Sequence, residues 1–303
     1  MEDKELFEFV GKEELQIKEF VRPSVSYWSD AWRRIKKNRF AMIGLVLIII
    51  LIVFAIIGPI ISPYEYDQTD LNNVYAPMSW KHIFGTDELG RDVLTRVLYG
   101  ARISLAVGFV ASFLNLIIGV IYGGISGYLG GRVDNIMMRI VDILYSVPIL
   151  LIVILLMVVL RPGLTNVFIA LGIAYWVGMA RIVRGQVLSL KEQEFTLAAK
   201  ALGADRRRIL LKHLIPNTIG PIIITATLLI PDAIFFESFL SFIGLGVSAP
   251  MASWGVLASD GVRAFRSHPN LFLVPSLFIC ITMLSFNFLG DGLRDSLDPR
   301  LRK

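Results

Sequence analysis

Phe40-Ala-Met-Ile-Gly-Leu-Val-Leu-Ile-Ile-Ile-Leu-Ile-Val-Phe-Ala-Ile-Ile-Gly-Pro-Ile-Ile61 carries no charge and, as a helix, is long enough to cross the roughly 30 Å hydrocarbon core of a bilayer. We predict a transmembrane helix here that Gly58-Pro59 breaks near its far side. Across the 303 residues, 55% are hydrophobic and 18% are charged, whereas a soluble domain carries about a quarter charged residues. The sequence therefore predicts an all-α, polytopic membrane protein.

Five further apolar runs predict five more transmembrane helices, and hence six in all. They cover residues 103–128, 137–160, 164–180, 217–244 and 271–289. Pro231-Asp232 is expected to interrupt the fifth helix, and residues 245–268 contain too much Gly, Ser and Pro for a simple helix. We divide the chain into residues 1–39, a first transmembrane helix 40–62, a segment 63–102, a core 103–290 and a tail 291–303.

Basic residues indicate which side of the membrane each connection faces. Nine Lys and Arg residues precede Phe40 and eight lie between Arg181 and Lys212, whereas segment 63–102 has only four. The excess of Lys and Arg in cytoplasmic loops therefore places both termini in the cytoplasm and segment 63–102 outside it. The net charge of +5 is accordingly interpreted as topology and attraction to anionic membrane lipid, and not as a nucleic-acid-binding surface.

Residues 1–39 are predicted to be a cytoplasmic tail that ends in an interfacial helix. Trp28, Trp32 and Ile35 recur on one helical face, and basic residues occupy the others. A basic cluster that only orients the first transmembrane helix is the alternative.

The segment Glu194–Pro216 is the longest strongly charged run between apolar spans in the second half of the chain. Residues 195–202 favour a helix, Gly203 suits its left-handed C-terminal position, and Asp205 can cap a second helix that begins at Arg206 and that Pro216 ends or bends. From spacing alone, a docking element for a soluble partner and an ordinary basic loop are equally supported. The candidate docking residues, within a coupling loop 190–216, are Leu197, Ala198, Ala199, Gly203, Ala204, Asp205, Arg206, Arg207, Arg208 and Pro216.

The sequence contains no motif for catalysis, phosphate binding or metal binding. It has no Gly-x-x-x-x-Gly-Lys-Ser/Thr loop and no Gly-x-Ser-x-Gly motif. Cys280 is the only cysteine, and the three histidines are far apart. We predict no catalytic residue, no metal site and no cofactor on this chain, so that energy must come from a partner or an ion gradient.

Three acidic residues fall within the predicted transmembrane helices, where charge is costly and often functional. Asp142 lies near one end, and we expect it to pair with Arg139 or Arg184. Asp232 and Glu237 point roughly 140° apart on an ideal helix, so they do not form one two-carboxylate site. They either line a polar translocation pathway that attracts a cationic group, such as a peptide amino terminus, or lie where water satisfies them.

The pattern Ala198-Ala199, Gly203 and Ile215-Pro216 resembles the loop that permease subunits of ATP-binding-cassette importers present to their ATPases. The family pattern is Glu-Ala-Ala, three residues, Gly, nine residues, and Ile-x-Leu-Pro. Here Leu197 replaces the Glu, His213 the Ile and Ile215 the Leu.

Four other motifs look like those of the C-type permease of dipeptide and oligopeptide importers. They occur in the family order and lie at residues 85–93, 99–104, 238–246 and 290–301. The resemblance implies a type I importer permease fold and a bacterial or archaeal cell membrane. It also implies a homologous second permease, two ATPase subunits that carry ATP and Mg, and an extracytoplasmic peptide-binding protein.

Three alternatives to peptide import remain, one among related importers and two outside them. Importers of nickel, glutathione or antimicrobial peptides share these permease motifs. A gradient-driven transporter would favour paired carboxylates and inverted repeats, and a membrane enzyme would need a nucleophile or an acid/base cluster; neither set of features is evident.

Overall fold

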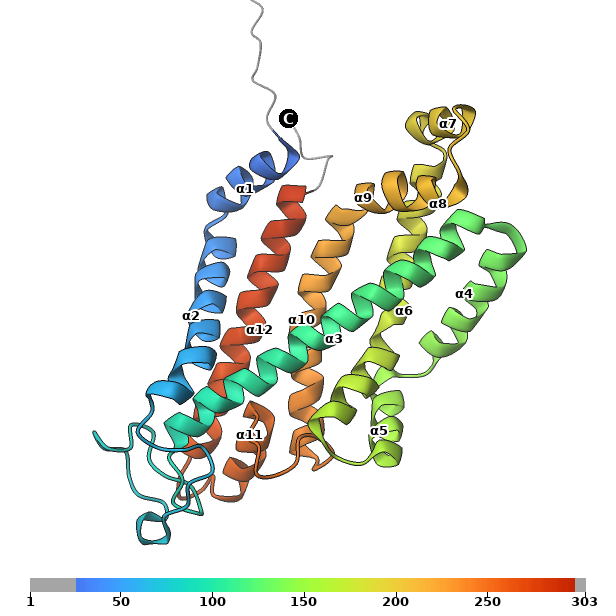
Figure 1. Cartoon of the computed structure of the whole chain (residues 1–303). Coiled ribbons are helices and arrows are strands. Elements are labelled where there is room, and N and C mark those ends of the chain that lie inside the picture. The colour runs from blue at the N-terminus through green and yellow to red at the C-terminus, as the bar shows by residue number, and fades with distance from the viewer. Residues whose placement is uncertain (1–25, 298–303) are drawn as a thin grey trace, which may run out of the picture.

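A computed structural model describes residues 26–297, which form a slanted bundle of helices (Figure 1). Regular helices begin and end at the following residues: α1 (Tyr27–Lys37), α2 (Arg39–Ile61), α3 (Val93–Leu129), α4 (Gly131–Ser146), α5 (Ile149–Leu160), α6 (Leu164–Lys191), α7 (Glu194–Ala201), α8 (Arg206–Arg208), α9 (Ile215–Asn217), α10 (Ile219–Phe242), α11 (Trp254–Arg263) and α12 (Asn270–Leu297). A 3₁₀ turn (Leu71–Asn73) and a π-helical segment (Ile209–Leu214) complete the list, and no strand occurs among these residues. Residues 1–25 and 298–303 of the predicted tails lie outside the described residues, whereas residues 291–297 of the predicted C-terminal tail continue α12.

Five helices, α2, α3, α6, α10 and α12, are long and apolar enough to cross a membrane. The predicted span over residues 137–160 is not one straight helix. It consists of α4 and α5, which meet at 84° around Val147 and Pro148. Pro148 lacks a backbone N–H and disfavours a helical conformation in the residue before it, which explains the break. If this bent pair counts as one span, residues 26–297 contain six.

Proline does not break α2 or α10, contrary to the sequence-based expectation. The α2 helix continues through Pro59 to Ile61, and α10 continues through Pro231. A proline in a helix frees the carbonyl four residues earlier, which for Pro59 is that of Ala55. The Arg102 guanidinium donates to this carbonyl at 3.2 Å, so a side chain of α3 replaces the lost bond.

Other boundaries also differ from the sequence-based ones. The α3 helix begins at Val93, ten residues before the predicted span, because the Asp92 carboxylate accepts a hydrogen bond from the Thr95 backbone at 2.8 Å and caps it. The α6 helix extends to Lys191, well past residue 180. Residues 254–263 form α11, which the Ser253 hydroxyl caps by accepting from the Val256 backbone at 3.2 Å. A local cap therefore extends α3 beyond its apolar run, and another starts α11.

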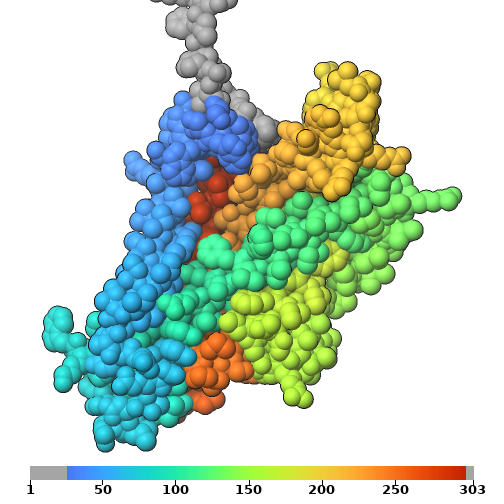
Figure 2. Space-filling view, viewed as in Figure 1, coloured from blue at the N-terminus to red at the C-terminus, as the bar shows by residue number. Residues whose placement is uncertain are grey.

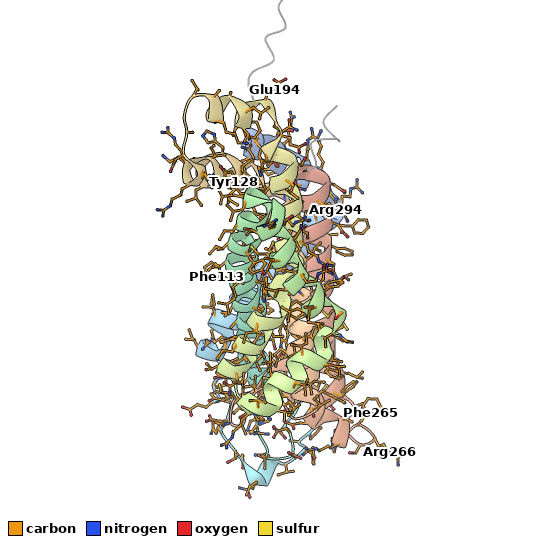
Figure 3. The ribbon with its side chains drawn as sticks, turned by 90° about the vertical axis from the view of Figure 1, so that its right-hand side faces the viewer. Phe113, Tyr128, Glu194, Phe265, Arg266 and Arg294 are labelled. Carbon is orange, nitrogen blue, oxygen red and sulfur yellow. The ribbon has the colours of Figure 1, made fainter. Side chains whose placement is uncertain are left out.

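The bundle has two distinct ends (Figure 1). One end, which we call the α7 end, carries α1, the last turns of α12, and α7 to α9. The opposite end, which we call the loop end, carries segment 62–92 and α11. Viewed from the side, Glu194 and Arg294 lie toward the α7 end, and Phe265 and Arg266 lie at the loop end (Figure 3). This arrangement separates the Glu194–Pro216 segment from segment 62–92 by the length of the bundle.

Glycines on α3 let its backbone pack closely against α6. A Cβ atom at Gly119 would lie 2.5 Å from the Cβ of Met179, and one at Gly127 would lie 3.0 Å from the Cβ of Val187. Small residues at helix contacts allow this close approach in membranes. The α3–α6 pair is therefore a tightly packed unit that runs from the membrane helices to the base of α7.

Ionic and hydrogen-bonded contacts hold segment 62–92 against the loop end. The Asp87 carboxylate accepts hydrogen bonds from the Leu89 and Arg91 backbones at 2.9 and 3.0 Å, and it pairs with the Arg96 and Arg91 guanidinium groups. Burial raises the pKa of Asp87, but Arg96, the two backbone donors and Arg91 together hold it below its ordinary value. Asp87 is therefore ionised at neutral pH and joins this segment to the start of α3.

Candidate functional site

The turn between α7 and α8 has the geometry that the sequence predicts. Gly203 adopts φ +80°, in the left-handed region where glycine is favoured. The Ala204 backbone N–H donates to the Ala199 carbonyl and the Gly203 N–H donates to the Lys200 carbonyl, both at 3.0 Å. These two bonds form a Schellman motif, which satisfies carbonyls left over at the C-terminus of a helix.

A capping bond then starts the second short helix. The Asp205 carboxylate accepts a hydrogen bond from the Arg208 backbone at 3.0 Å, so that α8 begins at Arg206 as predicted. Pro216 does not end the element abruptly. It lies within α9, between the π-helical segment and a break at Thr218, and so the chain bends toward α10 over several residues.

One face of α7 packs onto the end of the bundle. Thr196 is fully buried and its hydroxyl donates to the Leu190 carbonyl at 2.8 Å, which ties α7 to the last turn of α6. Ala199 is also buried and belongs to a cluster with Val187 of α6 and with Ile209 and Leu214 of the π-helical segment. This cluster therefore joins α7, α6 and the approach to α10.

The opposite face of the segment is exposed and apolar, with a basic border. Leu202 exposes 88% of its surface and Leu197 exposes 52%, although both are large hydrophobic side chains. Ala198 and Gly203 are exposed beside them, and the neighbouring cations of the segment are Lys200, Arg206, Arg207, Arg208 and Lys212. None of these cations forms a salt bridge within residues 26–297. An exposed apolar patch with a charged border is typical of a protein-interaction surface.

An ion pair that sequence reasoning missed supports this surface from below. The Arg184 guanidinium of α6 donates two hydrogen bonds, each of 2.6 Å, to the two carboxylate oxygens of Asp134 in α4. The Ser126 hydroxyl of α3 donates to the same carboxylate at 2.6 Å. This bidentate pair joins α3, α4 and α6 just before α7 begins. Fifty residues separate Asp134 from Arg184, so no helical spacing revealed the pair.

The predicted partners of Asp142 are wrong. The Asp142 carboxylate accepts from Arg181 at 2.6 Å, and not from Arg139 or Arg184. Arg184 is engaged by Asp134, and Arg181 also stacks over the Tyr145 ring at 4.1 Å. The sequence-based interpretation of Asp142 as an ion-pairing residue near the end of a span is otherwise consistent with this contact.

The two carboxylates of α10 lie in different surroundings. Glu237 is fully buried and accepts hydrogen bonds from the Ser104 and Ser241 hydroxyls at 3.1 and 2.8 Å. The Glu237 side chain therefore neither contacts water nor lines a pathway surface on this chain. The Ser104 hydroxyl in turn accepts from the Trp254 backbone at 3.2 Å, so Glu237 helps to hold the start of α11 between α3 and α10.

Asp232, in contrast, lies on an exposed face of α10, one turn and a half from Glu237. The Asp232 carboxylate is therefore accessible to another subunit or to a substrate. Of the candidate docking residues, Leu197, Ala198, Gly203 and Arg206 to Arg208 lie on one exposed surface at the α7 end, whereas Ala199 packs onto the bundle, and the two α10 carboxylates lie in separate surroundings. No cluster of three or more potential metal ligands occurs in the described part of the chain.

Comparison with protein families places this spanning bundle in a known family. Residues 115–303 match the family described as "Binding-protein-dependent transport system inner membrane component". The chain belongs to this family. It is accordingly a multi-pass transport permease of the inner membrane and not an enzyme. Residues 26–77 also match the N-terminal transmembrane domain of oligopeptide transport permease C.

Curated bacterial relatives extend the similarity over almost the whole chain. The dipeptide transport system permease protein DppC of Bacillus subtilis is 56% identical over 93% of this chain and 88% of that protein. The oligopeptide transport system permease protein OppC of the same organism is 53% identical over 99% of this chain and 98% of that protein. OppC of Escherichia coli K12 is 46% identical over 91% of this chain and 92% of that protein.

A solved structure shows the same fold in a more distant protein. A chain of the MetNI methionine ABC transporter, in an inward-facing conformation, superposes with a TM-score of 0.52. The match covers 66% of this chain and 96% of that chain at 20% sequence identity. The bundle is therefore the permease fold of an ATP-binding-cassette importer.

Proposed function

We propose that this chain forms half of the translocation pathway of an ATP-driven importer of oligopeptides or dipeptides. A second, homologous permease forms the other half, and two ATPase subunits bind ATP and Mg and supply the energy. The relatives named as peptide permeases support the substrate class, because they are similar over nearly the full chain. The observation that supports coupling to the ATPases is the exposure of Leu202, because 88% of the surface of this large apolar side chain is exposed at the end of the bundle.

The α7–α8 surface is the element that the ATPases contact. Leu197 and Leu202 supply apolar area, and Arg206 to Arg208 supply positive charge around it. Leu197 is apolar where the family pattern has Glu, so this chain docks there by burial of its side chain and not by a salt bridge. Buried apolar side chains dominate the binding energy of protein interfaces, and bordering charges mainly guide association.

Movement of α7 reaches the membrane helices through contacts that are already packed. When the ATPases bind ATP and close, they displace α7, whose buried Thr196 and Ala199 contact the end of α6 and the π-helical segment. The α6 helix passes the displacement to α3 across the Gly119 and Gly127 contacts. The permease pair then opens outward, accepts peptide from an extracytoplasmic binding protein at the loop end, and returns inward after hydrolysis.

This mechanism requires the α7 end, with both termini, to face the cytoplasm. The concentration of basic residues before Phe40 and between Arg181 and Lys212 supports that orientation. Along the pathway, Asp232 is the candidate contact for a cationic group of the peptide, because it is the exposed carboxylate of α10. Glu237 has a positioning role at most, since its side chain is fully buried.

Reconstitution of the complete transporter tests the proposed function. Vesicles that hold both permeases and both ATPases, with the binding protein added, should accumulate a labelled peptide only when ATP is present. Excess unlabelled peptide should suppress uptake, whereas nickel and glutathione should not. Uptake that an ion gradient drives without ATP, or purification of this chain free of any ATPase and second permease, would contradict the proposal.

A further inference from the structure

A large groove lies at the loop end between α2, segment 62–92 and α3, apart from the α7 surface. Its volume is about 610 Å³. Most of its walls are apolar side chains, among them Phe54 and Ile57 of α2, Trp80 and Ile83 of segment 62–92, and Leu94 and Leu98 of α3. Phe278 of α12 also borders it.

The groove lies beside the exposed apolar side of α2. Both Phe54 and Ile57 line it and are nearly half exposed, and Ile60 and Ile61 at the end of α2 are about three-quarters exposed. The α2 helix is among those long and apolar enough to span the membrane. In Figure 2, α2 and segment 62–92 form one edge of the molecule, from the middle of the bundle to the loop end. The mouth of the groove therefore opens on the exposed apolar side of α2.

The groove is a built feature and not loose packing. A Cβ atom at Gly58 would lie 2.9 Å from the Leu98 side chain, so α2 and α3 touch at that point. The Ser62 and Thr95 hydroxyls form a hydrogen bond of 2.5 Å that fixes the end of α2 to α3. Segment 62–92 then stands away from this junction and forms the third wall.

The rim of the groove carries one uncompensated cation. Lys81 is exposed and forms no salt bridge within residues 26–297. The other ionisable rim residue, Asp92, already accepts from His82, from the Thr95 backbone and from the Thr95 hydroxyl, at 3.0, 2.8 and 2.7 Å. Trp80 next to Lys81 is fully exposed, and tryptophan is enriched at the headgroup level of membranes.

We propose that this groove is a discrete binding site for one anionic phospholipid of the surrounding bilayer. An acyl chain occupies the space between Phe54, Ile57 and Leu98, and the phosphate of the headgroup lies at Lys81. An amphiphile matches an apolar trough that ends in a single cation, because its acyl chain contacts the apolar walls and its phosphate pairs with Lys81. Trp80 closes the site at the level of the glycerol backbone.

Photo-crosslinking in the complete transporter tests this site. The transporter is placed in vesicles of phosphatidylcholine that contain a small fraction of phosphatidylglycerol with a photoreactive acyl chain, and the labelled peptides are identified by mass spectrometry. In the wild type, label should concentrate on α2 and residues 80–84. Ile57→Trp fills the groove and should reduce this label about tenfold. Lys81→Gln should reduce it about fivefold, as expected for loss of one basic residue near the membrane surface.

Two matched variants control for general effects. Ile56→Trp places the same bulk on the adjacent position of α2, which is exposed but does not line the groove. Arg266→Gln removes an exposed cation of the loop end that lies away from the groove. Both should keep wild-type labelling. The proposal is overturned if Ile56→Trp and Ile57→Trp label equally, which would mean bulk lipid only. It is also overturned if the wild type carries no label on α2 and residues 80–84, which would mean that another subunit and not lipid fills the groove.

Discussion

Replacement of Gly203 by valine should uncouple transport from ATP hydrolysis without preventing membrane insertion. A Cβ atom at Gly203 would meet no atom within 4 Å, so steric collision with neighbours does not contribute. The cost arises from the backbone, because φ is +80° and a residue with a side chain pays roughly 1–2 kcal/mol in the left-handed region. β-Branching places valine at the upper end of that range.

That energy is enough to change the population of the turn. One to two kcal/mol shifts an equilibrium by about 5- to 30-fold. To escape the left-handed conformation, the chain must break the bonds from Ala204 to Ala199 and from Gly203 to Lys200. The angle between α7 and α8 then changes, while the buried contacts of Thr196 remain.

The assay is the number of labelled peptide molecules taken up per ATP hydrolysed, in vesicles that hold the complete transporter. Gly203→Val should reduce this ratio severalfold at an unchanged amount of transporter in the membrane. Gly203→Asn should stay near the wild type, because asparagine tolerates the left-handed region, and Gly203→Ala should fall between them. A wild-type ratio in Gly203→Val would refute the reasoning and return the segment to an ordinary basic loop.

Three further predictions concern stability, and each is measured by thermal unfolding of the purified transporter. Asp134→Asn removes the carboxylate that Arg184 binds through two hydrogen bonds, and it should cost about 1.5–3 kcal/mol; an unchanged melting temperature would contradict the bidentate pair. Asp87→Asn leaves the buried Arg96 with only the Asp260 carboxylate, 4.0 Å away, and should cost about 3 kcal/mol at pH 7, the lower end for breaking a buried pair. The pKa of Asp87 is lower in the folded chain than in the unfolded one, so its contribution to stability is complete above the ordinary value of 3.8. The difference in stability between variant and wild type should therefore shrink as the pH falls through the folded pKa. A difference that stays constant with pH would contradict this. Glu237→Gln keeps a hydrogen-bond acceptor and should leave stability nearly unchanged. Glu237→Leu leaves two buried hydroxyls without an acceptor and should cost about 1–3 kcal/mol for each. Equal effects of the two substitutions would exclude the hydrogen-bonding role.

The membrane class and the turn at Gly203 could be predicted from the sequence because both depend on local signals. An uncharged run such as Phe40–Ile61 needs no partner to be recognised, and the order of Gly203 and Asp205 determines the turn and the cap within a few residues. The peptide-permease family could likewise be recognised, because several motifs lie in the family order.

Features that depend on contacts distant in sequence could not be predicted. Pro59 was expected to break α2, but Arg102 of α3 supplies the missing hydrogen bond. Asp142 was expected to pair with Arg139 or Arg184, yet Arg184 binds Asp134 and Asp142 pairs with Arg181. The bend of 84° between α4 and α5 is different, because Pro148 is a local signal for it, but residues 137–160 read as one apolar run by hydropathy.

Site-specific crosslinking from Leu202 tests the central claim most directly. Cys280 is the only cysteine of the chain, so a Cys280→Ser background permits a single reporter at Leu202→Cys. With a short thiol-reactive photo-crosslinker in the assembled transporter, Leu202→Cys should crosslink to an ATPase subunit, and the yield should change when ATP binds. A reporter at Phe265→Cys, which is exposed at the loop end, should give no ATPase crosslink. Absence of any ATPase crosslink from Leu202→Cys, in a transporter that still imports peptide, would contradict the assignment of α7–α8 as the docking surface.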